Sequence, residues 1–186
     1  MNLKSSILLL ALALPALAGP PLICHPVEIH GAKSLPWNAH AQGWDGADKS
    51  YDASTRLIPD TLALLTPLTP VSVRMETLRR ASIYAARHAT LAADLATKLE
   101  ARANQPTATA LQTFDIGYWI ESVRQASFIY RYNMLSPAEK QTWQIRKGLP
   151  ARDGYPLLQK AIQMGGSPEM SRALALVEEY RRSDTN

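Results

Sequence analysis

Three Ser/Thr-Pro pairs divide most of the chain into helical segments, and they constrain its fold more than any other feature. They are Thr69-Pro70, Ser136-Pro137 and Ser167-Pro168. A Ser or Thr side chain caps the first turn of a helix, and proline is favoured at the first helical position. At the second pair, Glu139 completes a capping box. Repeated starts of this kind predict an all-α fold.

From about Thr55 onward, Ala, Leu, Arg, Glu and Gln dominate, and these residues lose least on becoming helical. We expect about six antiparallel helices, arranged as a bundle or as a solenoid-like array of helical hairpins. The first two, before and after residues 88–90, form an antiparallel pair, with one long helix as the alternative. The aromatic-rich segment 107–133 is expected to be the central, most buried helix. Short helices follow at 137–148, 157–164 and 168–182.

Residues 1–18 have the three parts of a secretory signal peptide. Lys4 supplies a positive charge, residues 7–14 form an apolar run, and Ala16-Leu17-Ala18 is a small-residue cleavage site. We therefore expect a periplasmic or secreted product with no transmembrane anchor after cleavage. The formal charge of +4 is spread along the chain rather than clustered, which disfavours nucleic acid as a partner.

Residues 19–53 are rich in Pro, Gly, His and Trp and show no helical period, so we expect an irregular N-terminal arm before a helical domain at 54–186. Within the arm, the stretch 23–29 is a candidate short strand. Pro26 lacks the N–H that a central strand needs, which restricts this stretch to an edge strand or an extended arm. Trp37 and Trp44 could stack on envelope sugars, but we favour the interpretation that they pin the arm to the helices.

The only Cys and three of the four His gather in this arm, as Cys24, His25, His30 and His40. Thiolate and imidazole are the usual ligands of Zn and Cu, so these four residues form a candidate metal site. Their spacing matches no standard zinc finger, and the alternative is a set of ordinary polar positions. Cys24 could also pair between two chains to form a dimer, or act as a nucleophile with a base such as His88.

A second candidate site lies on the aromatic helix, where we predict an inter-helix groove for a protein or peptide near Tyr118, Glu121, Arg124 and Tyr132. The alternative is structural. Glu76 and Arg80 are spaced i, i+4 and Glu121 and Arg124 i, i+3, so both pairs favour ion pairs that lock neighbouring helices together.

A faint internal repeat relates Arg79-Arg80-Ala81-Ser82 to Arg124-Gln125-Ala126-Ser127, at a spacing typical of helical solenoids. The helix-pair layout resembles tetratricopeptide-like repeats in architecture. Only Ile116-Gly117 fits that family's Leu-Gly step, and Thr113 stands where its large aromatic residue belongs. The segments 22–37, 74–81 and 111–125 also resemble an uncharacterised family of secreted bacterial proteins, a resemblance that implies no activity or site.

The sequence contains no Gly-rich phosphate loop, G-x-S-x-G elbow or H-E-x-x-H motif. We therefore expect an exported, non-enzymatic interaction or scaffold protein with an unidentified partner and no cofactor. The first alternative is a periplasmic protein that binds Zn or Cu through the Cys/His cluster. The second is an enzyme of a type that the sequence does not identify.

Overall fold

The computed structural model describes residues 21–38, 44–88, 90–131, 134–145, 149 and 152–184, and this part of the chain is all-helical. The helices are α1 (Pro21–Cys24), α2 (Ala53–Leu64), α3 (Val71–Ala85), α4 (Leu91–Ala103), α5 (Ala110–Arg131), α6 (Pro137–Thr142), α7 (Tyr155–Gln163) and α8 (Pro168–Asp184). The all-α prediction is confirmed. The described residues contain no strand, only an isolated bridge between Trp37 and Ala47. The predicted signal peptide lies outside them.

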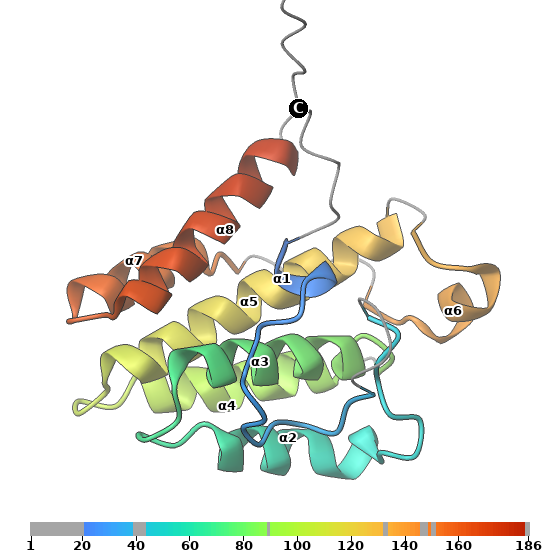
Figure 1. Ribbon diagram of the computed structural model, residues 1–186, viewed down its shortest axis with the longest axis horizontal. Helices are drawn as coiled ribbons and strands as arrows, with labels where there is room; N and C mark the ends of the chain where they lie inside the picture. Colours follow the sequence, from blue (N-terminus) through green and yellow to red (C-terminus); the bar gives the residue numbers. More distant parts are fainter. Residues whose placement is uncertain are drawn as a thin grey trace, which may run out of the picture.

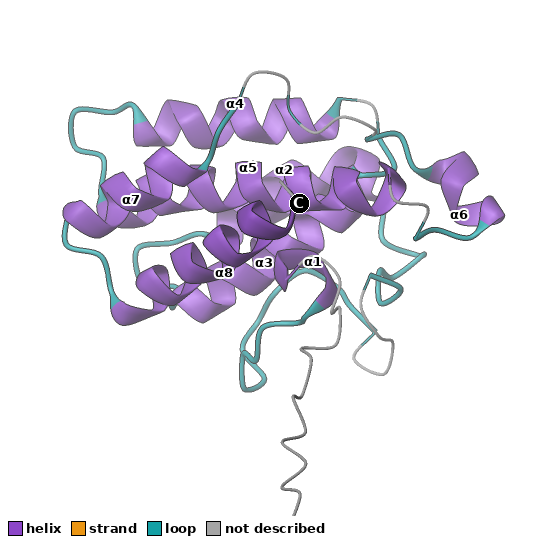
Figure 2. Cartoon of the chain, turned by 90° about the horizontal axis from the view of Figure 1, so that it is seen from above, coloured by secondary structure: helices purple, strands orange, loops and turns teal. Residues whose placement is uncertain are grey.

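Helix α5 is the centre of the fold, as its aromatic content predicts. It contacts α3 and α4 on one side and α7 and α8 on the other, with α2 packed beneath α3 and α4 (Figure 1). The view from above places α4 along one flank, with α1 and α8 on the other side of α5 (Figure 2). Phe114, Tyr118 and Trp119 are fully buried along α5. None of the described helices is long and apolar enough to span a membrane.

The helix boundaries follow the predicted caps with small shifts. Ser136 caps α6 through the expected capping box with Glu139. The first pair is displaced by one residue, because Pro70 is the N-cap of α3 and the Thr69 hydroxyl donates to the Leu64 carbonyl instead. The segment around residues 86–90 does break the helix, so α3 and α4 are two helices rather than one.

Helix α6 is shorter than predicted. It ends at Thr142 because Trp143 adopts an extended conformation, which turns the chain back toward α3. The backbone N–H groups of Gln144 and Ile145 then both donate to the carbonyl of Ala86, at 2.6 and 3.0 Å. This contact satisfies a carbonyl that the end of α3 would otherwise leave open.

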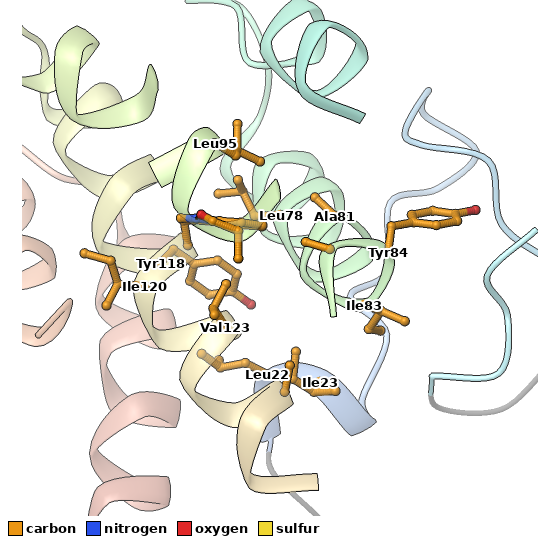
Figure 3. Packing of buried hydrophobic residues seen from close by; sticks show 14 of the residues in the cluster. Leu22, Ile23, Leu78, Ala81, Ile83, Tyr84, Leu95, Tyr118, Ile120 and Val123 are labelled. Carbon is orange, nitrogen blue, oxygen red and sulfur yellow. The ribbon is translucent and has the colours of Figure 1, made fainter. Parts of the chain in front are cut away.

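The start of the arm is helical, which corrects the expectation of a short strand at 23–29. Leu22 and Ile23 of α1 are 1% and 0% exposed, and they insert between α5 and α3 beside Val123 and Ile83 (Figure 3). The Leu22 N–H donates to Gln125 Oε1 at 2.7 Å. Burying two large apolar side chains stabilises the docked arm more than an exposed edge strand would, by about 3–5 kcal/mol in total.

A buried ion-pair cluster on α3 holds the next part of the arm. Arg79 Nε and Arg80 Nε each donate to Glu76 at 2.7 Å. The cluster reaches the arm because Glu76 Oε2 accepts from the Val27 N–H, and Arg79 donates to the Ile23 carbonyl. The same two guanidinium groups lie over the Trp37 ring, at 4.7 and 5.6 Å from its centre. Trp37 therefore pins the arm, as the sequence interpretation favours.

Two glycines allow α5 and α7 to approach closely. A Cβ atom on Gly154 would collide with the Gly117 carbonyl and lie 2.9 Å from Glu121 Cγ. We expect Gly154→Ala to lower the free energy of unfolding by about 2 kcal/mol, because one helix must move to admit the methyl group. Urea denaturation measures this, with Lys160→Ala on the exposed face of α7 as the control. A Gly154→Ala protein as stable as the wild type would contradict the close approach.

Candidate functional site

A pocket of about 420 Å³ opens where the arm, the end of α3 and α6 meet. The lining residues come from the arm and the start of α2, from the end of α3 and the turn after it, and from α6: Asp48, Lys49, Tyr51, Ala53, Tyr84, Arg87, His88, Ala138, Glu139 and Thr142. The volume falls in the range of small-molecule sites in proteins. Three chain segments that are far apart in the sequence thus form one concave surface.

The inner wall of the pocket is aromatic. The rings of Tyr51 and Tyr84 pack 4.9 Å apart at 55°. Their hydroxyl groups are already used, because Tyr51 donates to Asp60 Oδ2 at 3.0 Å and Tyr84 donates to the Pro36 carbonyl at 2.6 Å. Burial raises the pKa of both phenols. Both rings are therefore neutral and fixed, and they offer apolar surface to a ligand.

The rim of the pocket is charged, and its acids have partners. Asp48 accepts from the backbone and hydroxyl of Ser50, and these bonds lower its pKa. Glu139 accepts from the Ser136 N–H at 2.7 Å and from Trp44 Nε1 at 3.3 Å. Its bonds to Ser136 are the main reason that its pKa is lowered.

The basic side chains of the rim, unlike its acids, make no contacts of this kind with the described residues. Within the described part of the chain, the side chains of Lys49, Arg87 and His88 make no hydrogen bond and no close ion pair. Lys49 is exposed, whereas Arg87 and His88 are half-buried just beyond the last turn of α3. These three groups can donate hydrogen bonds to a ligand without first breaking contacts within the protein.

The residues predicted for a partner groove lie elsewhere and have other contacts. Tyr118 and Glu121 are fully buried. Glu121 binds Arg124 at 2.6 Å, accepts from the Gly154 N–H at 2.9 Å, and lies 3.5 Å from Arg181 on α8. Burial raises the pKa of Glu121 despite these partners. Glu121 therefore joins α5 to the residue that precedes α7 and to α8, as in the structural alternative.

The fourth residue of the predicted groove, Tyr132, lies outside the described residues. Arg124 is the most accessible of the others, with 28% of its side chain exposed.

The predicted metal ligands are not gathered in the described part of the arm. Cys24 is half-buried at the end of α1, whereas His25 is exposed. The side chain of His30 is 89% exposed and lies 3.7 Å from Glu28. His40 lies outside the described residues. No group of three or more His, Cys, Asp or Glu in the described residues is arranged to hold a metal ion.

The Cys24 thiol is held in its protonated form. Burial raises its pKa from about 9 to about 11, although the charge of Arg79 acts in the opposite direction. Only the thiolate is nucleophilic. We therefore expect iodoacetamide at pH 8 to alkylate Cys24 about 100-fold more slowly in the folded protein than in urea, which a stopped time course with mass spectrometry measures. Rates within a few-fold of each other would contradict this.

Comparisons with models of known protein families, with curated proteins and with solved structures found no match. The pocket is therefore interpreted from its own residues.

Sequence reasoning located this pocket only in part. The sequence indicates His88 as a possible base and Trp44 as a residue that pins the arm, but no pattern distinguishes Lys49, Tyr51, Tyr84 or Arg87. The two tyrosines are aromatic residues of ordinary spacing, and the pocket exists only because residues 48–53 fold back over the end of α3. The one available clue was the concentration of polar residues at the break between α3 and α4.

Proposed function

We propose that this protein is an exported, non-enzymatic helical binding protein whose ligand occupies the pocket between the arm, α3 and α6. The observation that carries the proposal is the combination of a fixed aromatic wall with three bases whose side chains make no hydrogen bond and no close ion pair in the described structure. Export rests on the signal features of residues 1–18.

The contrast with the interior supports this choice of site. The buried charged side chains of α3 and α5 have ionic partners, as Glu76, Arg74 and Glu121 show. Such groups stabilise the arrangement of helices. The pocket rim instead combines an accessible surface with donors that have no partner, and such donors are the groups that fix the orientation of a ligand.

A substitution that fills the pocket tests the proposal. Ala138 is exposed on α6 and lines the pocket, whereas Gln141 is exposed on the same helix and does not. The wild type, Ala138→Trp and Gln141→Trp are purified from the compartment to which they are exported. Native mass spectrometry then detects small molecules that remain bound, and a fragment library is screened by NMR.

We expect ligand binding to the wild type and to Gln141→Trp, with NMR shifts at Tyr84 and His88, and at least a tenfold loss in Ala138→Trp. Equal thermal stability of the three proteins excludes misfolding as the cause. Binding that is unaffected by Ala138→Trp, or a wild type that binds nothing in either assay, would overturn the proposal.

A further inference from the structure

The charges of the pocket identify the class of ligand, an inference that rests on the function proposed above. We infer that the pocket takes a small organic acid: one carboxylate on an apolar body the size of a single ring. The carboxylate lies against Arg87, His88 and Lys49, and the apolar body lies against Tyr51 and Tyr84.

The acids of the rim accept hydrogen bonds within the protein, whereas the side chains of its bases donate none within the described residues. Asp48 and Glu139 already accept hydrogen bonds from Ser50, Ser136 and Trp44. A cationic ligand would have to share or displace these donors. An anionic ligand could accept hydrogen bonds from the bases without breaking any existing bond. Such charge-assisted hydrogen bonds are stronger than those between neutral groups.

The carbonyl groups at the end of α3 would repel an anion if they had no hydrogen-bond donors. They are not free. The carbonyls of Ser82 and Tyr84 accept from Ala86 and Arg87, and that of Ala85 accepts from His88. The Ala86 carbonyl accepts from both Gln144 and Ile145. The bases that follow the helix therefore face the pocket without an open row of carbonyls beside them.

Asp45 is another acid whose charge bears on these bases. Asp45 is largely exposed. The partial loss of solvent around it and the neighbouring Glu139 raise its pKa. The charges of Arg87 and Lys49 act in the opposite direction but are weaker. Asp45 shares a hydrogen bond with Glu139 and does not line this pocket. It therefore leaves the three bases available to a ligand.

The aromatic wall of the pocket indicates that the ligand has an apolar part. Both tyrosine hydroxyls are committed to Asp60 and Pro36, so the pocket presents ring carbons and the methyl groups of Ala53 and Ala138. Inorganic anions would use the bases but leave this surface exposed. A ring-bearing acid uses both, and aromatic ligands gain further by packing against tyrosine rings.

Three probes of one shape and different charge test the inference: benzoate, benzamide and benzylammonium, with inorganic phosphate as a fourth probe that lacks an apolar body. NMR titration at pH 7 measures each affinity. We expect benzoate to bind at least fivefold more tightly than benzamide, with benzylammonium and phosphate weaker still.

Two variants assign the effect to the pocket. Arg87→Gln and His88→Gln should each weaken benzoate binding two- to tenfold and leave benzamide binding unchanged. Lys98→Gln removes one charge from the exposed face of α4 and should change neither. Because these side chains make no hydrogen bond and no close ion pair in the described structure, the variants should keep the wild-type thermal stability.

The outcomes separate the ligand class from the function. If benzamide or benzylammonium binds as well as benzoate, or if both pocket variants leave benzoate binding unchanged, the organic-acid inference is wrong. The same holds if no probe binds at up to about 10 mM. The binding function fails separately, when the Ala138→Trp comparison shows no ligand that depends on the pocket.

Discussion

Replacing Glu76 with glutamine is expected to lower the free energy of unfolding by about 3–5 kcal/mol, the usual consequence of removing one partner from a buried ion pair. Glu76 is 1% exposed and holds Arg79, Arg80 and the Val27 N–H at once. Glutamine keeps the shape but not the charge, so the fully buried guanidinium of Arg79 loses its counter-ion. Chemical denaturation measures the loss.

The effect should depend on pH in a defined direction. Burial by itself would raise the pKa of Glu76, but its bonds to Arg79, Arg80 and Val27 outweigh burial and lower it. The unfolded chain then binds the proton more readily than the folded one, so the stabilisation is present above the ordinary pKa of glutamate and is lost as the pH falls through the folded value. The difference between wild type and Glu76→Gln should therefore shrink toward acid.

Glu28→Gln is the matched control. Glu28 belongs to the same arm, but its side chain is 74% exposed, and in the described part of the chain its ionisable neighbour is His30 at 3.7 Å. The change should leave stability nearly unaltered. Hydrogen exchange adds a local readout, since the Val27 amide should exchange faster in Glu76→Gln alone. A Glu76→Gln protein with wild-type stability and a protected Val27 amide would show that the cluster does not hold the arm.

The helical elements were predictable because their signals are local. A Ser-Pro start and a capping box act within one turn, so Ser136 and Ser167 mark α6 and α8 whatever surrounds them. The central place of α5 was also predictable, since apolar and aromatic residues occupy more than one of its faces. The length of α6 was not predictable. The helix ends where the chain turns at Trp143 toward the carbonyl of Ala86, and a local sequence pattern gives no information about this distant contact.

The burial of α3 shows why the rest could not be predicted. Its sequence has one apolar stripe and several charged residues, which is typical of a surface helix. Arg74, Glu76 and Arg79 are nevertheless at most 1% exposed, because the arm covers one charged face and α5 supplies Asp115 to the other. The sequence spacing correctly paired Glu76 with Arg80, but not with the backbone of Val27, which lies 49 residues away.

The pocket could not be predicted from the sequence either, because it also depends on contacts between residues that are far apart in the chain. Its wall and its rim come from the arm, from the end of α3 and from α6. Conversely, the sequence predicts a ligand-binding role for Glu121, because aromatic residues surround it along the helix. The structure shows that its carboxylate is used by Arg124 and by the Gly154 N–H. A buried acid with an i+3 arginine has the same sequence pattern whether it binds a ligand or another helix.

Arg74→Met should be as damaging as Glu76→Gln, with a loss of about 3–5 kcal/mol. Arg74 donates to Asp115 Oδ2 at 2.6 Å, to the Thr69 carbonyl at 3.0 Å and to the Thr66 carbonyl. Methionine fills a similar volume but leaves Asp115 without its counter-ion. It also removes the Arg74 bonds to the two loop carbonyls, although the Thr66 carbonyl still accepts from the Thr69 N–H. Urea denaturation at neutral pH measures the loss, and a decrease of less than about 1 kcal/mol would contradict this account.

The pH dependence separates the ion pair from the lost carbonyl bonds. Burial raises the pKa of Asp115 to about 6, even though Arg74 lowers it. The folded wild type therefore binds more protons than the unfolded chain between about pH 4 and 6, and stability falls across that window as the pH rises. Without Arg74 the pKa rises further, so the window extends upward and the deficit of Arg74→Met should be larger at pH 8 than at pH 5. Adding Asp115→Leu should abolish this pH dependence and recover part of the stability, since no buried carboxylate remains.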